Sequence, residues 1–395
     1  MTTQAARPLT TRPGASGTPG VSGTPGAHHA IDAQGEARPV RARPAPPMFA
    51  WQRRDMMKEV RDKARQLMKG YCRVCPVCNG KACAGEVPGM GGLGTGATFA
   101  ANLDALAAVR LNMRLVHDVK EPDTSTTVCG MALDMPVLAA PIGGVSFNMG
   151  GGVSEEDYAA AVVGGCAERG IIGCTGDGVP PFIIDAGFAA ITGAGGRGIP
   201  FIKPWDGAEL DEKLDRALEL GCPAIGMDID AAGLVTLRKM GRPVGPKTPA
   251  ELSRIVAKVK AKGMAFILKG IMTTIDASLA VEVGADGIVV SNHGGRVLDH
   301  APGTAEVLPE IADAVKGRIA ILADGGVRDG VDVFKMLALG ADAVLLGRPF
   351  SIAAVGGLKD GVTMLVDSIK GQLVQAMVLT GSANVAAIGR HALRM

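Results

Sequence analysis

Aromatic residues are scarce in this sequence of 395 residues, which contains only 2 Trp, 2 Tyr and 9 Phe. A ligand pocket in this chain must therefore be built mostly from backbone, aliphatic and charged groups. An excess of one charge is also lacking, because 41 basic and 39 acidic residues leave a net charge of +2. No block of like charge stands out either, so nothing indicates binding to nucleic acid or to an anionic membrane.

Long apolar runs are missing as well. None approaches the roughly 20 residues that a membrane-spanning helix needs, so we expect no membrane span. The first thirty residues also lack the apolar region of a secretory signal. We therefore expect a cytoplasmic protein, in whose reducing environment the 8 cysteines do not form disulfides.

Glycine is abundant, with 56 residues, and it helps to divide the chain. Residues 1–47 are rich in Gly, Pro, Ser and Thr and repeat the motif SGTPG, which predicts a disordered tail. Apolar residues at helical spacing in 51–71 predict an amphipathic helix. This helix and the Cys- and Gly-rich residues after it form a predicted N-terminal cap, 48–115, which precedes a main domain over 116–395.

A regular alternation of short apolar runs and helical stretches begins at residue 136. Uninterrupted apolar runs are typical of parallel strands that are covered on both faces. Eight strand–helix units in about 210 residues predict an α/β protein with a (β/α)8 TIM barrel. A doubly wound sheet is the alternative, but no dinucleotide-binding glycine motif follows the first run. The eight runs are 136–141, 171–175, 199–203, 224–229, 265–269, 287–291, 319–323 and 343–347.

Polar residues cluster where these runs end, which is where barrel enzymes have their active sites. We expect them to converge on one ligand: Gly143, Thr175, Asp177, Lys203, Asp228, Asp230, Lys269, Ser291, His293, Asp324, Gly347 and Arg348. The segments ADGGVRDG (323–330) and LGRP (346–349) follow the last two strands, where barrels often bind phosphate. Their glycines let backbone N–H groups approach an anion, and Arg328 and Arg348 add charged donors. Two ordinary tight turns are the alternative.

The segment SNHGGRVLD, 291–299, can be read in two ways. His293 is either a catalytic base or a polar residue of a glycine-rich turn. His293 and Arg296 are three residues apart beyond a strand end, so they can face one small anion. The proposed phosphate loops and Lys269 favour the catalytic interpretation.

Residues 268–304 and 321–350 together resemble the FMN-dependent α-hydroxy acid oxidases and dehydrogenases, a family that includes glycolate oxidase, lactate oxidase and flavocytochrome b₂. The resemblance runs without gaps through 264–350, is looser over about 115–230 and fails before Asn102. It implies a barrel that binds FMN through Pro141, Ile142, Gly143, Thr175, Lys203, Asp228, Lys269, Ser291, Asp324, Gly325, Gly326, Arg328, Gly347 and Arg348.

The resemblance also implies an activity, the oxidation of a small L-2-hydroxy acid, with L-lactate as the expected substrate and an unspecified electron acceptor. His293 would take the hydroxyl proton while hydrogen passes to flavin N5. Asp230 would orient His293, Arg296 would bind the carboxylate, and Lys269 would stabilise the reduced flavin. Two other functions stay open: an isomerase like type 2 isopentenyl diphosphate isomerase, and a flavin-binding scaffold or electron-transfer partner. We also expect a homo-oligomer.

The sequence departs from the family pattern at several positions. Trp205 stands where a substrate-contacting tyrosine is usual, and Lys203 stands where a glutamine usually contacts the flavin. The family's N-terminal tyrosine has no clear counterpart, although Tyr71 is a candidate. Arg238 is a candidate for a second guanidinium near the substrate.

Four cysteines in the cap have no counterpart in the family pattern. Cys72, Cys75, Cys78 and Cys83 follow the spacing C-x₂-C-x₂-C-x₄-C. Thiolates at this spacing can bind zinc or an iron–sulfur cluster. Structural thiols that cap the barrel mouth and redox-active thiols are the alternatives.

Overall fold

The computed structural model describes residues 50–394 of the chain, with side chains from residue 56 onward. The predicted tail, 1–47, lies outside these residues. From α1 (Ala50–Leu67) onward, the chain forms one compact unit.

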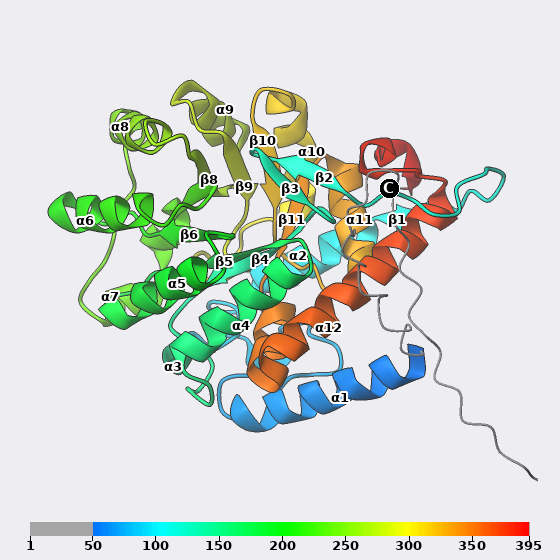
Figure 1. The fold of residues 1–395 in the computed structure, drawn as a ribbon, viewed down its shortest axis with the longest axis horizontal. Coiled ribbons are helices and arrows are strands. Elements are labelled where there is room, and N and C mark those ends of the chain that lie inside the picture. Colours follow the sequence, from blue (N-terminus) through cyan, green and yellow to red (C-terminus); the bar gives the residue numbers. More distant parts are fainter. Residues whose placement is uncertain (1–49, 395) are drawn as a thin grey trace, which may run out of the picture. The chain divides into compact units, whose positions relative to one another are not determined.

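Eight parallel strands close into a barrel, which confirms the predicted fold (Figure 1). The sheet closes because the last strand pairs with the first, with Val344 opposite Val137. This closure excludes the doubly wound alternative. Each strand overlaps one of the eight predicted runs: β4 (Val137–Ile142), β5 (Ile172–Thr175), β6 (Gly198–Ile202), β7 (Ala224–Asp228), β8 (Ala265–Ile271), β9 (Gly287–Val290), β10 (Ala320–Ala323) and β11 (Ala343–Leu346).

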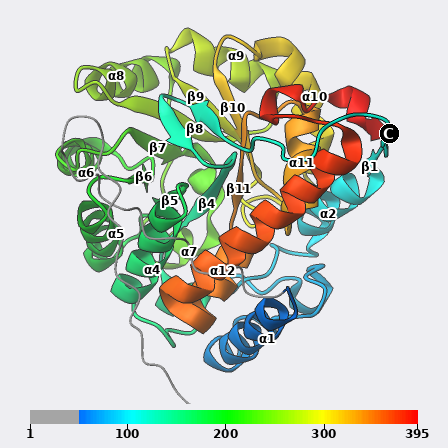
Figure 2. The same cartoon turned by 45° about the vertical axis from the view of Figure 1, so that its right-hand side comes forward.

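Helices surround the strands (Figure 2). Sequence signals explain their bounds: α8, for example, begins after Thr248, which forms a capping box with Glu251. Eight helices follow the eight strands: α4 (Glu155–Glu168), α5 (Pro181–Gly193), α6 (Gly207–Leu218), α8 (Pro249–Lys260), α9 (Thr274–Glu282), α10 (Thr304–Val315), α11 (Gly330–Leu339) and α12 (Arg348–Thr380). The loops after β4 and β7 also contain the short helices α3 (Val145–Asn148) and α7 (Val235–Lys239).

The barrel interior is a packed apolar core that is closed at one end by a hairpin. The hairpin consists of β2 (Thr126–Val128) and β3 (Met131–Leu133), which pair antiparallel. Its buried Val128, Met131 and Leu133 belong to the same cluster as inward-facing strand residues such as Leu138 and Ile267. The opposite end, where the strands finish, is therefore the end at which a ligand can enter.

The cap packs against the outer helices of the barrel. α1 contacts α12, and α2 (Ala97–Ala108) contacts α10. The short strand β1 (Arg110–Leu111) pairs with β12 (Leu393–Arg394), which joins the end of the cap to the end of the chain. Between α1 and α2, the cysteine segment contains a single turn of 3-10 helix, Lys81–Cys83.

Among the described residues, α12 alone is long and apolar enough to be considered as a membrane span. Its backbone is non-helical at Leu358, with φ 47° and ψ −138°, so it consists of two helices that meet at a kink. Buried residues such as Phe350 and Met377 lie on both sides of the kink. This pattern is the one expected of a helix that packs in a protein core.

Candidate functional site

A large pocket opens at the C-terminal ends of the strands, with an empty volume of about 1260 Å³ that includes open solvent. This is the place that barrel architecture predicts for a site. Most of the predicted site residues line it: Pro141, Ile142, Gly143, Lys203, Asp228, Lys269, His293, Arg296, Asp324, Gly325, Gly326, Arg328, Gly347 and Arg348.

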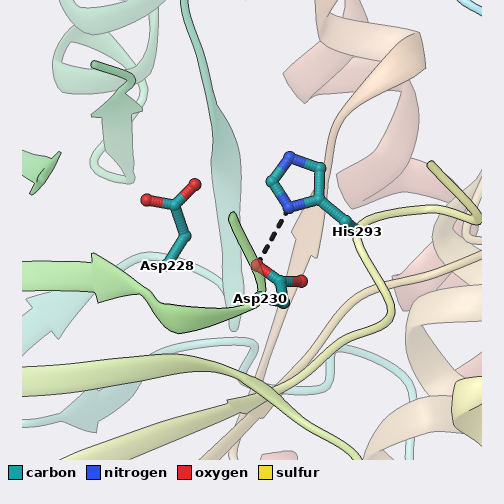
Figure 3. A group of neighbouring side chains, drawn as sticks. All are labelled: Asp228, Asp230 and His293. Carbon is teal, nitrogen blue, oxygen red and sulfur yellow. Dashed lines mark hydrogen bonds and ion pairs between the residues drawn. The ribbon is translucent and has the colours of Figure 1, made fainter. Parts of the chain in front are cut away.

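His293 lines this pocket, and Asp230 pairs with it from behind the lining. The Nδ1 atom of His293 donates to Oδ1 of Asp230 over 3.0 Å, while Asp228 lies nearby without a bond to the imidazole (Figure 3). The backbone of His293 is left-handed, at φ 56°, a strained conformation for a residue with a side chain. Such strain costs about 1–3 kcal/mol and is concentrated at functional sites. Together, the strain and the carboxylate partner favour a functional histidine over an ordinary turn residue.

The two glycines after His293 allow close approach from two sides. A Cβ on Gly294 would lie 2.8 Å from a guanidinium nitrogen of Arg348, and one on Gly295 would lie 2.6 Å from the backbone nitrogen of Phe99. The space beside these glycines therefore belongs to the barrel's last loop and to the cap. It is therefore not open space for a ligand.

Buried charges of both signs surround the His293–Asp230 pair. Lys269 Nζ lies 3.7 Å from Asp230 and 3.8 Å from Asp324, and Lys203 Nζ bonds Asp228 over 3.1 Å. Asp230 is the carboxylate bonded to the imidazole, so its charge can stabilise positive charge that develops there during a reaction.

The pKa values of the buried groups follow these contacts. Burial alone would raise the pKa of Asp230, but the charges of Lys269 and His293 lower it below its usual value. Burial would lower the pKa of Lys269, but three aspartates raise it. Asp230 and Lys269 thus remain charged at neutral pH. In contrast, burial raises the pKa of Asp324.

Three arginines, Arg296, Arg328 and Arg348, line the side of the pocket that faces the cap. The guanidinium of Arg296 donates to the carbonyl of Gly89 and, over 2.9 Å, to Oδ1 of Asn148. Arg348 donates to the carbonyl of Met90 over 2.9 Å and lies above the ring of Phe99. Burial lowers the pKa of Arg296 to about 10, and burial with repulsion from the other arginines lowers that of Arg348 to about 9. A bound anion raises the pKa of such guanidinium groups again, because it stabilises their positive charge.

Three other candidate residues do not line the main pocket: Trp205, Tyr71 and Arg238. Trp205 is buried and donates through Nε1 to Asp177 over 2.6 Å, so its indole is part of a structural network. Tyr71 lines a smaller hollow that shares Phe147, Thr236 and Met240 with the main pocket. The exposed Arg238 bonds only weakly to a nearby backbone carbonyl, over 3.4 Å.

Two predicted cofactor contacts are buried behind the pocket surface. Ser291 is fully buried, and its Oγ accepts a bond from the backbone nitrogen of His293 over 3.1 Å. Thr175, at the end of β5, is also buried. In this structure Ser291 supports the His293 turn.

The FMN-dependent dehydrogenase family model matches residues 89–260 and 240–395. The chain belongs to the FMN-dependent dehydrogenase family. The cysteine segment, 72–83, lies outside the part that the family model matches.

The relatives of this chain include L-lactate dehydrogenases and a 2-hydroxyacid oxidase. It is 34% identical to an L-lactate dehydrogenase of Caulobacter vibrioides, over 75% of this chain and 89% of that protein. It is 31% identical to the peroxisomal (S)-2-hydroxyacid oxidase of Arabidopsis thaliana, over 75% and 88%. A shorter match, 56% identical, covers 32% of this chain and 33% of an L-lactate dehydrogenase of Xanthomonas campestris, so the chain spans about a third of that relative.

Solved structures of mandelate oxidase share the fold. The one with benzoyl-formic acid has a TM-score of 0.68 at 30% identity, covering 86% of this chain and 97% of that one. The mandelate oxidase with (S)-2-phenylpropionate has a TM-score of 0.67 at 30% identity and the same coverage.

The pocket of this chain fits FMN, the cofactor in the family's name. Lys269 Nζ, Asp324 Oδ1 and Arg328 Nε are buried and have no hydrogen-bond partner among the described residues. Buried polar groups are nearly always bonded, so these atoms indicate a polar ligand. Gly347 adds room, because a Cβ built on it would meet only ordinary contacts, the nearest at 3.7 Å. A flavin with a phosphate and hydroxyl groups offers partners for all three atoms.

Some residues of the pocket were not predicted. Asn148 and Met90 line it and hold the two arginines, yet no sequence motif marks them. The one sequence signal in this region is the glycine-rich run after Pro88, because glycine permits a close approach of backbone. The apolar part of the lining, also not predicted, includes Phe147, Leu234, Leu237 and Met240.

Proposed function

We propose that this chain is an FMN-dependent oxidoreductase that converts a small L-2-hydroxy acid, L-lactate foremost, into the 2-oxo acid. The observation that carries this proposal is His293, which is bonded to Asp230 and lines the same pocket as Arg296. A base and a guanidinium suit a substrate that has both a hydroxyl and a carboxylate. The names of the relatives agree, since they refer to lactate and other 2-hydroxy acids.

His293 acts as the general base in this proposal. Asp230 accepts a hydrogen bond from the Nδ1–H group, so Nε2 of the imidazole has a lone pair that can take the substrate's hydroxyl proton. Asp230 then stabilises the imidazolium. General-base help of this kind typically contributes about 10²–10⁴-fold to the rate.

Arg296 binds the substrate carboxylate in this proposal. Asn148 and the Gly89 carbonyl hold its guanidinium in place, so little side-chain freedom is lost when the anion binds. The apolar side chains of Leu234 and Met240 line the same pocket and suit a short aliphatic group.

FMN, when bound, supplies the acceptor for the hydrogen that leaves the substrate carbon. Gly325, Gly326, Gly347, Arg328 and Arg348 would hold its phosphate. Lys269 would supply a fixed positive charge beside the flavin ring.

An anaerobic titration of the yellow holoenzyme tests this proposal. We expect L-lactate to bleach the flavin absorption, and glycolate, L-mandelate and longer L-2-hydroxy acids serve as a size series. D-Lactate is the stereochemical control, and isopentenyl diphosphate tests the isomerase alternative. The proposal fails if none of the L-2-hydroxy acids bleaches the flavin. His293→Ala should keep the colour and lose rapid bleaching.

A further inference from the structure

The cysteine segment, 72–83, lies between α1 and the anion-binding side of the pocket. Arg61 and Arg65 of α1 hold its backbone by donating to the carbonyls of Cys75, over 2.6 Å, and Val74, over 3.0 Å. On the other side, Nη2 of Arg328 contacts the carbonyl of Cys78 at 3.3 Å and its Sγ at 3.6 Å. Because Arg328 also lines the pocket, one side chain connects the two places.

The segment concentrates thiols in a fixed, partly shielded position. Cys72, Cys75, Cys78 and Cys83 are all free and all partly buried. N–H groups contact two of the sulfurs. The backbone nitrogen of Val74 lies 3.4 Å from Sγ of Cys72, and Arg328 contacts Sγ of Cys78. Hydrogen bonds to sulfur and nearby positive charge are what an anionic iron–sulfur centre needs around its thiolates.

The spacing of the thiols bears on which kind of metal centre they could bind. A zinc ion bound at about 2.3 Å holds its sulfurs about 4 Å apart. In residues 56–394 no three of these thiols lie within 4.8 Å of one another, so their side chains would have to move closer together to bind a single zinc ion. An iron–sulfur cluster holds its thiolates farther apart, because its own iron and sulfide atoms lie between them.

We propose that Cys72, Cys75, Cys78 and Cys83 bind a four-iron iron–sulfur cluster beside the pocket. Arg328 donates to one of its thiolates, and Arg61 and Arg65 hold the loop that supplies the others. The cluster gives the chain a one-electron carrier next to its candidate active site. This inference does not depend on which acid, if any, the pocket oxidises.

The test is the metal content of the full-length protein, purified anaerobically and then incubated with ferrous iron, sulfide and a thiol reductant. We expect about four irons and about four acid-labile sulfides per chain, with an electron paramagnetic resonance signal after reduction by dithionite. Cys78→Ser should lower the amount of iron bound per chain at least tenfold. The matched control is Cys222→Ser, a buried cysteine outside the segment, which should keep the full content.

Several outcomes would overturn the proposal. They are one zinc per chain in place of iron, an iron content that Cys78→Ser leaves unchanged, and wild-type protein without iron and sulfide after reconstitution. If Cys78→Ser fails to fold, Cys75→Ser decides, because the bond from Arg61 to residue 75 uses the backbone carbonyl and survives the change. Metal and sulfide are measured without substrate, so failure here leaves the proposed oxidation untouched, and failure of that oxidation leaves the cluster untouched.

Discussion

Replacing Asp230 by Asn is the sharpest test of the proposed mechanism. The change keeps the size of the side chain but removes the charge that faces His293 Nδ1 at 3.0 Å. At an effective dielectric constant of 20, a unit charge pair at this distance is worth about 5.5 kcal/mol when the imidazolium forms. His293 is 19% exposed, and Lys269, 3.7 Å from Asp230, opposes the imidazolium. Both effects reduce the expected loss to about 3–4 kcal/mol, or about 10²–10³-fold in rate.

The assay is anaerobic stopped-flow, which follows the flavin absorption after the enzyme is mixed with L-lactate. We expect the limiting rate constant to fall and the concentration for half-maximal rate to change little, because Asp230 does not line the substrate pocket. Asp228→Asn is the comparison variant: it removes the same charge from the same group, but Asp228 bonds Lys203 and not His293. The fall in its limiting rate constant should be at least tenfold smaller than that of Asp230→Asn. A rate for Asp230→Asn within twofold of wild type, or equal losses in both variants, would refute the role of Asp230.

Three further predictions follow from the pocket. Arg296→Lys should raise KM for the acid by about 10–100-fold while FMN stays bound, because an ammonium cannot bind a carboxylate in the bidentate way; an unchanged KM in steady-state assays would contradict this role. Gly347→Ala should leave the melting temperature of the FMN-free protein unchanged, since its Cβ meets nothing closer than 3.7 Å, but should weaken FMN binding at least tenfold by fluorescence titration; equal FMN affinity would remove Gly347 from the cradle. FMN affinity should fall as pH rises through about 9, where Arg348 loses the proton that attracts phosphate; a flat affinity between pH 7 and pH 10 would count against that contact.

The barrel could be predicted because its strands are marked locally. Runs such as GIVV of β9 are apolar without alternation, and that pattern requires cover on both faces wherever it occurs. The order of polar residues after these runs then predicted the pocket, since parallel strands that close into a barrel bring their C-terminal ends together. His293, Lys269 and Asp324 were found in this way.

Contacts between segments that lie far apart in the chain could not be predicted. The contact of Arg296 with Asn148 joins residues 148 positions apart, and Arg348 meets Met90 across 258 positions. Neither Asn148 nor Met90 lies in a local sequence pattern that predicts its contact with an arginine. Trp205 illustrates the opposite case: its position in the chain suggested a substrate contact, but its bond to Asp177 draws the indole into a buried network.

By itself, the sequence determined the barrel, the end of it that holds the site, and the residue types that meet there. These features depend on hydrophobic burial and strand direction, which are encoded in short segments. Only the tertiary structure decided which groups bond one another: Asp230 to His293, the cap carbonyls to two arginines, and Arg328 to Cys78. Hydrogen bonds and ion pairs depend on distances of a few ångströms, and packing sets such distances only when distant segments of the chain come together.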